Sequence, residues 1–109
     1  MGAEIFMDEA VERFLNHLRV ERGMARNTMS AYGTDLAQLV AYLLKHGKTD
    51  WKAIAETDLL GYQVHLSRAR LKSRSVLRKM IALRGFFQFC KNERLLKQNP
   101  AERLELPRV

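Results

Sequence analysis

The sequence predicts an all-α fold. Apolar residues recur at helical spacing in four stretches, and no stretch alternates between apolar and polar side chains as a half-buried strand would. No hairpin dipeptide separates two apolar runs. The chain has 109 residues, 47% of them hydrophobic, which is enough for one modest core without disulfides or metal. We therefore expect four main helices in one domain.

The first helix is predicted from a stripe of apolar residues at helical spacing: Met7, Val11, Phe14, Leu15 and Leu18. Acidic residues gather near its start: Glu4, Asp8, Glu9 and Glu12. Carboxylates there suit the helix dipole. Gly23 is a plausible helix stop, and Thr28 can accept a hydrogen bond from the free amides of the next helix. The second helix is therefore predicted to begin near Thr28.

The second helix has a predicted buried stripe of six residues: Met29, Tyr32, Leu36, Leu39, Val40 and Leu43. The sequence KHG at 45–47 supplies a basic last turn and a glycine, so this helix should end before Lys48. Residues 50–55 predict one short helical turn that places Trp51 and Ile54 in the core.

Thr57 or Asp58 is the predicted cap of the third helix, whose buried residues are expected to be Leu60, Val64 and Leu71. Ser73 or Ser75 caps the fourth helix in this prediction. Its apolar stripe comprises Val76, Met80, Leu83, Phe87 and Cys90. Leu95 and Leu96 can add a turn, whereas Pro100 and Pro107 disfavour helix before them, so the end of the chain is predicted to be a docked tail or linker.

The charge of the chain is strongly positive. Lys and Arg number 19 against 12 Asp and Glu, which gives a net charge of +7 and favours a polyanionic partner. The excess is local, because no acidic residue occurs between Asp58 and Glu93. Eight basic residues fall in that interval: Arg68, Arg70, Lys72, Arg74, Arg78, Lys79, Arg84 and Lys91.

The fourth helix is predicted to carry one polar face, with Lys79 and Ala82 beside it: Arg74, Arg78, Ile81, Gly85 and Gln88. Arg can pair with guanine edges in the major groove, and Lys and Ser can contact phosphates. Two alternatives exist for such a run of charges. It can be a solvated surface without function, or it can bind an anionic membrane, although so small a domain needs the apolar stripe of this helix for its core. Gly85 indicates a close approach to another backbone.

Two stretches, which together carry three motifs in order, resemble one known family. FLNHLRVERGMARNTMSAYGTDL at 14–36 and SRSVLRKMIALRGFFQFCKNERLLKQNPAERLELP at 73–107 resemble the N-terminal core-binding domain of Xer-type tyrosine recombinases, in the phage-integrase superfamily. The first signature is matched at Leu18, Arg19, Gly23, Thr28, Tyr32, Asp35 and Leu36. The second is matched at Ser75, Arg78, Leu83, Arg84 and Phe86, with Met80 in place of leucine. Asn99, Pro100, Ala101, Leu106 and Pro107 match the family's linker.

This resemblance implies an orthogonal four-helix SAM-like bundle over residues 1–98 that forms half of a clamp around DNA, followed by a linker at 99–109 toward a catalytic domain. The second and fourth helices would approach the major groove. The implied DNA-binding residues are Arg26, Asn27, Thr28, Ser30, Lys72, Arg74, Ser75, Arg78, Lys79 and Ala82. The implied partners are double-stranded DNA, the parent's own catalytic domain, and sister recombinase subunits in a synaptic tetramer.

Two positions depart from the family pattern. Gly33 stands where relatives often carry a basic residue, so one phosphate contact is missing. Ile81 replaces a commonly small polar residue, where it can touch a thymine methyl or a neighbouring subunit.

No catalytic residue, metal site or cofactor is predicted. The tyrosines Tyr32, Tyr42 and Tyr62 fall on helix faces where packing is expected, and the family's catalytic residues belong to its other domain. The histidines His17, His46 and His65 lack metal-ligand spacing, and Cys90 is the single cysteine. We therefore expect a non-enzymatic domain of a tyrosine recombinase. The lone cysteine and the absence of a signal peptide or long apolar run predict a cytoplasmic protein without membrane contact.

Two alternatives remain. Ile81, Phe86 and Phe89 near the polar face are compatible with a helical protein-interaction module. A stand-alone DNA-binding protein of the helix-turn-helix kind is the other alternative, for which we expect a stable dimer without DNA.

Overall fold

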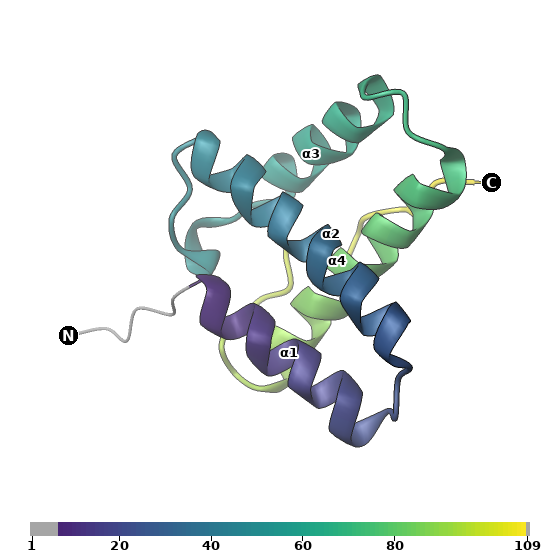
Figure 1. Cartoon of the computed structure of the whole chain (residues 1–109). Helices are drawn as coiled ribbons and strands as arrows, with labels where there is room; N and C mark the ends of the chain where they lie inside the picture. The colour runs from purple at the N-terminus through teal and green to yellow at the C-terminus, as the bar shows by residue number, and fades with distance from the viewer. Residues whose placement is uncertain (1–6, 109) are drawn as a thin grey trace.

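The computed structural model describes residues 7–108, which form four α-helices and one short 3-10 turn (Figure 1). The elements are α1 (Met7–Glu21), α2 (Arg26–Lys45), η1 (Trp51–Ala53), α3 (Glu56–Arg68) and α4 (Ser73–Asn92). No strand occurs among these residues. The long helices α2 and α4 cross each other, and α1 packs against both. Glu4, predicted near the start of α1, lies outside the described residues.

The start of α2 corrects the prediction. Its N-cap is Ala25 in an extended conformation, and the helix begins at Arg26, so Thr28 lies inside the first turn. Gly23 adopts the left-handed conformation, with φ of 58°, and ends α1 as predicted. Because alanine has no side-chain acceptor, the first amides of α2 are left without a side-chain cap. The end of α2 at Lys45 agrees with the prediction.

The starts of α3 and α4 also differ from the predicted caps. Ala55 is the N-cap of α3, and the Asp58 carboxylate accepts a hydrogen bond from the Ala55 amide at 2.8 Å. Lys72 is the N-cap of α4, with no side-chain cap, so neither Ser73 nor Ser75 has that role. The Lys72 carbonyl accepts the Ser75 amide at 2.9 Å, which closes the first turn through the backbone alone.

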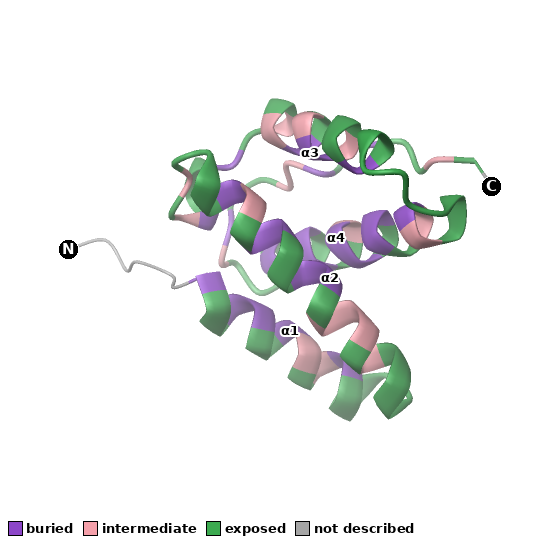
Figure 2. Ribbon diagram, turned by 45° about the horizontal axis from the view of Figure 1, so that its top comes forward, coloured by how far each residue is buried: buried purple, intermediate pink, exposed green. Residues whose placement is uncertain are grey.

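Aromatic side chains form the centre of the core. Phe86 lies between Trp51, at a ring-centroid distance of 4.6 Å, and Phe14, at 5.8 Å. The indole of Trp51 donates a hydrogen bond to the Met7 carbonyl at 3.1 Å, which satisfies its one polar atom. The predicted stripe of α4 is buried throughout, and the short turn places Trp51 and Ile54 in the core as predicted (Figure 2).

The predicted buried face of α3 is wrong. Leu60, Val64 and Leu71 are exposed at 43%, 47% and 40% of their surfaces. The residues of α3 that enter the core are instead Leu59, Tyr62 and Leu66. Both sets have helical spacing, and the structure selects the one that lies roughly 150° away around the helix.

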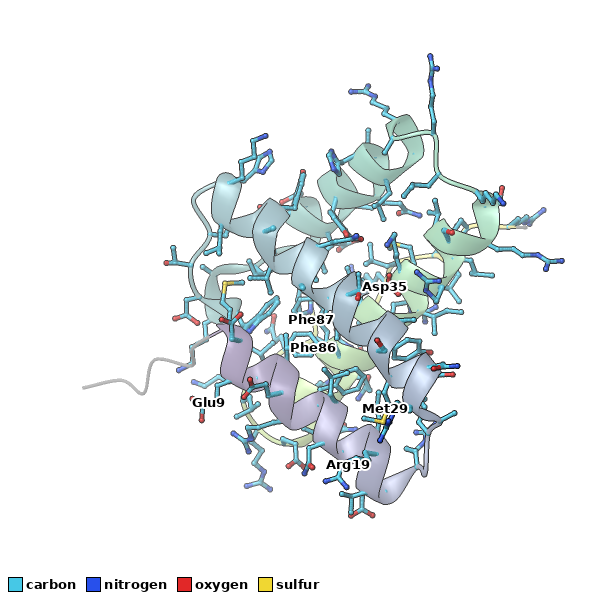
Figure 3. The ribbon with its side chains drawn as sticks, viewed as in Figure 1. Glu9, Arg19, Met29, Asp35, Phe86 and Phe87 are labelled. Carbon is cyan, nitrogen blue, oxygen red and sulfur yellow. The ribbon has the colours of Figure 1, made fainter. Side chains whose placement is uncertain are left out.

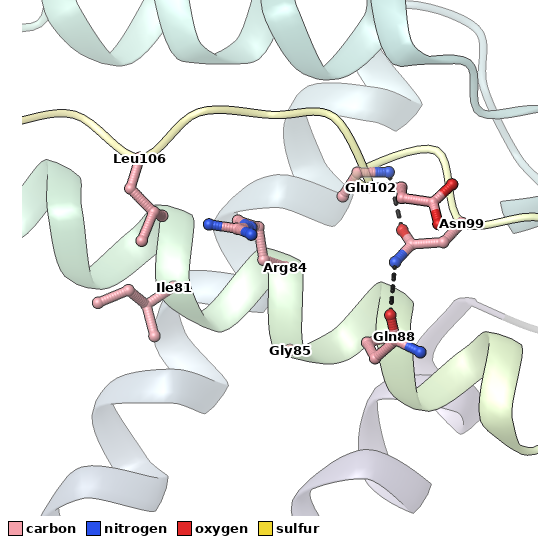
Figure 4. Close-up of a pocket in the computed structure, with 8 residues that line it drawn as sticks. Ile81, Arg84, Gly85, Gln88, Asn99, Glu102 and Leu106 are labelled. Carbon is pink, nitrogen blue, oxygen red and sulfur yellow. Dashed lines mark hydrogen bonds between the residues drawn. The ribbon is translucent and has the colours of Figure 1, made fainter.

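The residues after α4 dock against the domain. The Asn99 side-chain nitrogen Nδ2 donates to Gln88 Oε1 at 3.2 Å, and the Asn99 side-chain oxygen Oδ1 accepts the Ala101 backbone amide at 2.8 Å (Figure 4). Ala101 and Leu104 are buried in the main core, beyond the predicted boundary at residue 98. Leu96 is buried without extending α4, because Arg94 turns left-handed after the helix. The boundary itself stays a prediction, and Val109 lies outside the described residues.

Candidate nucleic-acid interface

The N-terminal ends of α2 and α4 lie on the same side of the molecule. In two views the helices cross near their middles and diverge toward this side, where the loop from α3 to α4 is also found (Figures 1 and 2). We call this surface the basic end. It is defined by Arg26, Asn27, Thr28, Ser30, Lys72, Arg74 and Ser75. The crossing of the two helices therefore brings together residues that are more than forty positions apart in the sequence.

The two helices of the basic end begin differently from the other two. α1 carries Asp8 and Glu9 in its first turn, and α3 carries Glu56 and Asp58. Neither α2 nor α4 has an acid in the first turn or a side-chain cap. The first amides of a helix have no intrahelical acceptors, and the helix dipole makes that end positive. Both termini at the basic end therefore present uncompensated positive character.

The side chains at the basic end are open to solvent. Arg26, Asn27, Thr28, Lys72 and Arg74 are exposed, as is Ser30, whereas Ser75 is half-buried. Within residues 7–108, none of the cationic groups Arg26, Lys72 and Arg74 forms an ion pair. Their charges are therefore available to a ligand.

Arg78 and Lys79 both pair with Asp35 of α2. Arg78 donates from Nε to Asp35 Oδ2 at 2.8 Å and from Nη2 to Oδ1 at 2.9 Å. Lys79 Nζ donates to the same Oδ1 at 2.8 Å and also to the Gln38 side-chain oxygen. Asp35 lies where α2 crosses α4 (Figure 3). These four side chains, the Asp35 cluster, join the two helices of the basic end.

Burial corrects two of the predicted surface positions. Lys79 is 7% exposed and Ala82 is fully buried, so neither lies on the open side of α4. The Arg78 side chain keeps 44% of its surface exposed. The reason is rotational: Lys79 and Ala82 border the polar face, and the crossing of α2 covers that border. A buried cation is costly without an anionic partner, and Asp35 supplies that partner to Lys79.

Asp35 stays ionised in this environment. Burial by itself would raise the pKa of its carboxyl group, but hydrogen bonds and charge from Arg78 and Lys79 outweigh that effect and lower the pKa below its ordinary value. The cluster thus combines two positive charges with one negative charge. Sequence reasoning identified Asp35 only as a motif position, although an acid within the stripe of Tyr32, Leu36 and Leu39 is itself a signal for a buried partner.

Other predicted surface features are internal. Phe86 and Phe89 are buried at 0% and 7% exposure, so two of the three residues that suggested a protein-binding patch belong to the core. A Cβ atom at Gly85 would lie 3.4 Å from the Phe14 ring, so this glycine accommodates a side chain rather than a neighbouring backbone. Ile81 is exposed and borders a groove of about 310 Å³ between α4 and the tail (Figure 4).

The tyrosines and two of the histidines pack against other side chains. Tyr62 is buried, Tyr32 and Tyr42 are half-buried, and the rings of His46 and His65 pack against Tyr42. Within residues 7–108, no three His, Cys, Asp or Glu side chains gather as a metal site requires. Among the same residues, no helix combines the length and apolarity needed to cross a membrane.

Comparison with known proteins identifies the family. Residues 11–94 match the family described as phage integrase, N-terminal SAM-like domain. The chain belongs to this family. As an integrase N-terminal domain, it is 33% identical over 103 residues to tyrosine recombinase XerC of Herpetosiphon aurantiacus, which covers 94% of the chain. It is 32% identical over 103 residues to tyrosine recombinase XerD of Oceanobacillus iheyensis, with the same coverage.

The fold comparison agrees. The crystal structure of the N-terminal domain of a phage integrase/site-specific recombinase from Haloarcula marismortui matches 96% of this integrase domain with a TM-score of 0.86 and 14% identity. This match confirms the predicted all-α SAM-like bundle. The chain spans about a third of the length of its curated relatives, 34% for the XerC protein and 35% for the XerD protein.

Proposed function

We propose that this domain binds double-stranded DNA through the basic end, as the non-catalytic half of a clamp in a tyrosine recombinase. The observation that carries the proposal is the pair of helix N-termini, α2 and α4, which lie on one side without an acid or a side-chain cap. Beside them are Arg26 and Arg74, which form no ion pair with any residue of the 7–108 range. A helix N-terminus flanked by cations suits phosphate oxygens. Membership in the integrase family supports the choice of DNA as the polyanion.

The residues of the site divide by role in this proposal. Arg26, Lys72 and Arg74 neutralise phosphates, while Asn27, Thr28, Ser30 and Ser75 donate hydrogen bonds to phosphates or base edges. Arg78 and Lys79 position the two helices through Asp35, and Ala82 allows their close packing. These groups act together to set the spacing of the two N-termini on the duplex.

The end of the chain fits the same proposal. After Leu104 enters the core, the tail runs toward the basic end (Figures 1 and 2). A catalytic domain joined to this tail would therefore lie near the bound duplex. The domain supplies affinity and register, the catalytic domain supplies cleavage, and sister subunits meet on the same DNA.

A charge-reversal experiment tests the proposal. Arg26→Glu and Arg74→Glu should each weaken binding to a mixed-sequence duplex by tenfold or more, because each change replaces a phosphate contact with repulsion. Lys97→Glu is the matched control, since Lys97 is exposed and lies beyond the opposite end of α4. Equal effects of all three substitutions would show that net charge alone matters and would contradict the proposed site.

The salt dependence gives an independent measure. The logarithm of the binding constant should fall with the logarithm of salt concentration at a slope of about −4.5 to −7, for roughly five to eight phosphate contacts. Each reversal at the basic end should reduce the magnitude of the slope by about 0.9 or more. Binding that does not change with salt would exclude a phosphate interface.

A further inference from the structure

All four helices end in the same backbone conformation. The second residue after each helix has a positive φ: Gly23 at 58°, Gly47 at 78°, Arg70 at 57° and Arg94 at 59°. Glycine adopts this left-handed conformation without steric cost, and it is the usual residue at this position. α3 and α4 instead place arginine there, so each accepts a backbone penalty that glycine would remove.

Arg70 gains no compensating contact inside the protein. It is exposed, and no hydrogen bond or ion pair involves its side chain within residues 7–108. The loop and the adjoining ends of α3 and α4 hold three other exposed cations, Arg68, Lys72 and Arg74, and the preceding acid in the sequence is Asp58. Like charges so close together repel one another, which lowers the stability of the loop further.

Position separates Arg70 from Arg94. The loop between α3 and α4 lies on the side of the basic end (Figures 1 and 2), whereas Arg94 follows the opposite terminus of α4. Two acidic residues, Glu93 and Glu102, lie within eight positions of Arg94 in the sequence, whereas the segment 68–74 contains no acidic residue. Arg70 is four residues from Arg74, so their Cα atoms are at most about 14 Å apart. A duplex seated on the N-termini of α2 and α4 would place its backbone within reach of both.

We propose that the loop at 68–72 is a third contact of this domain with the DNA backbone, in which Arg70, supported by Arg68, binds a phosphate next to the one bound at the start of α4. This inference rests on the proposed function and extends the basic end from Lys72 back along the loop to Arg70 and Arg68. The left-handed conformation fixes the backbone at Arg70, whose side chain is exposed. A short, fixed turn loses less conformational freedom on binding DNA than a longer or more flexible loop would lose.

Opposite effects on stability and binding test the inference. Arg70→Gly removes the cation and relieves the backbone, so its denaturant midpoint should equal or exceed that of the unchanged 109-residue chain. Its affinity for a mixed-sequence duplex should fall several-fold, and the salt slope should lose about 0.9 in magnitude. Arg94→Gly is the matched control, because Arg94 has the same position after α4 that Arg70 has after α3. It should change the denaturant midpoint by a similar amount and leave the duplex affinity and the salt slope unchanged. Arg70→Lys should retain most of the binding.

The outcomes distinguish this inference from the proposed function. If the unchanged chain binds duplex with a steep salt slope and Arg70→Gly does the same, the loop contact is wrong and the proposed site stands. Equal weakening by Arg70→Gly and Arg94→Gly would also overturn the loop contact. A chain with no salt-dependent duplex binding would overturn both. Arg70→Asn, which tolerates the left-handed conformation without charge, repeats the test if the glycine variant is poorly folded.

Discussion

Asp35 links the two helices that carry the proposed DNA surface. Its side chain is fully buried and pairs with two cations of α4, so it connects α2 to α4. The residues involved are 43 and 44 positions apart, so local sequence patterns say nothing about their contact. The sequence did place Arg74 and Arg78 on one polar face, but it could not show that Arg78 turns inward to a carboxylate while Arg74 remains open.

Asp35→Asn should strongly destabilise the fold. Removing the charge leaves Lys79 buried without its anionic partner, which costs about 3 kcal/mol or more of unfolding free energy. Urea denaturation measures the loss, and Asp8→Asn on the exposed surface of α1 is the control. A loss below about 1 kcal/mol would mean that the cluster contributes little to the crossing of α2 and α4.

The same carboxylate should give stability a defined pH dependence. Because the pKa of Asp35 is lowered in the folded state, its contribution is present above the unfolded value of about 3.9 and is lost as the pH falls through the folded pKa. The stability difference between the unchanged chain and Asp35→Asn should therefore shrink as the pH is lowered below about 4. Denaturation midpoints measured across pH 2–7 test this, and a constant difference would contradict it.

Tyr62, unlike Asp35, is a buried polar residue whose side-chain polar group has no partner among the described residues. Its hydroxyl is buried with no hydrogen-bond partner among the described residues, and burial first, with the charge of Asp35 second, raises its pKa to about 12. Tyr62→Phe removes an unsatisfied polar group and should raise the unfolding free energy by about 1 kcal/mol. Thermal denaturation measures the change. A clear loss of stability would reveal a bound partner for the hydroxyl, such as an ordered water.

At the scale of single helices, sequence reasoning succeeded where side chains carry the signal. The stripe of α4 and the glycine stops of α1 and α2 were predicted because apolar spacing and left-handed glycines are visible in sequence. The starts of α2 and α4 were misplaced because alanine and lysine N-caps offer no side-chain acceptor to recognise. In α3 two apolar sets share helical spacing, and only packing against α2 and α4 selects Leu59, Tyr62 and Leu66.

Two helical glycines should be stabilised to different extents by substitution with alanine. At Gly33 of α2 a Cβ atom would lie 3.4 Å from Leu15 Cδ1, an ordinary contact, so Gly33→Ala should stabilise the domain by up to about 1 kcal/mol through helix propensity. At Gly61 of α3 it would lie 3.1 Å from the Tyr42 hydroxyl oxygen, which must shift to make room. Gly61→Ala should therefore gain less than Gly33→Ala, and the reverse order in chemical denaturation would contradict this account.

At the scale of the whole molecule, the bundle separates packing from recognition. Aromatic residues of α1, η1 and α4 form the core, while α2 and α4 cross so that their unprotected N-termini share one side with the loop at 68–72. The basic interval was predicted from composition, and the approach of the second and fourth helices to one groove was implied by the family resemblance. The crossing that brings their N-termini to one side is not specified by any local pattern of residues. Recognition in this account is a property of the assembled bundle.

A chemical-shift titration of the 109-residue chain with a short duplex tests the central claim most directly. We expect the perturbed backbone amides to cluster at 26–30 and 68–78, at the N-terminal ends of α2 and α4 and the loop before α4, with the amides at 91–98 unchanged. Perturbations concentrated at 91–98, or spread evenly over the surface, would contradict a DNA interface at the basic end.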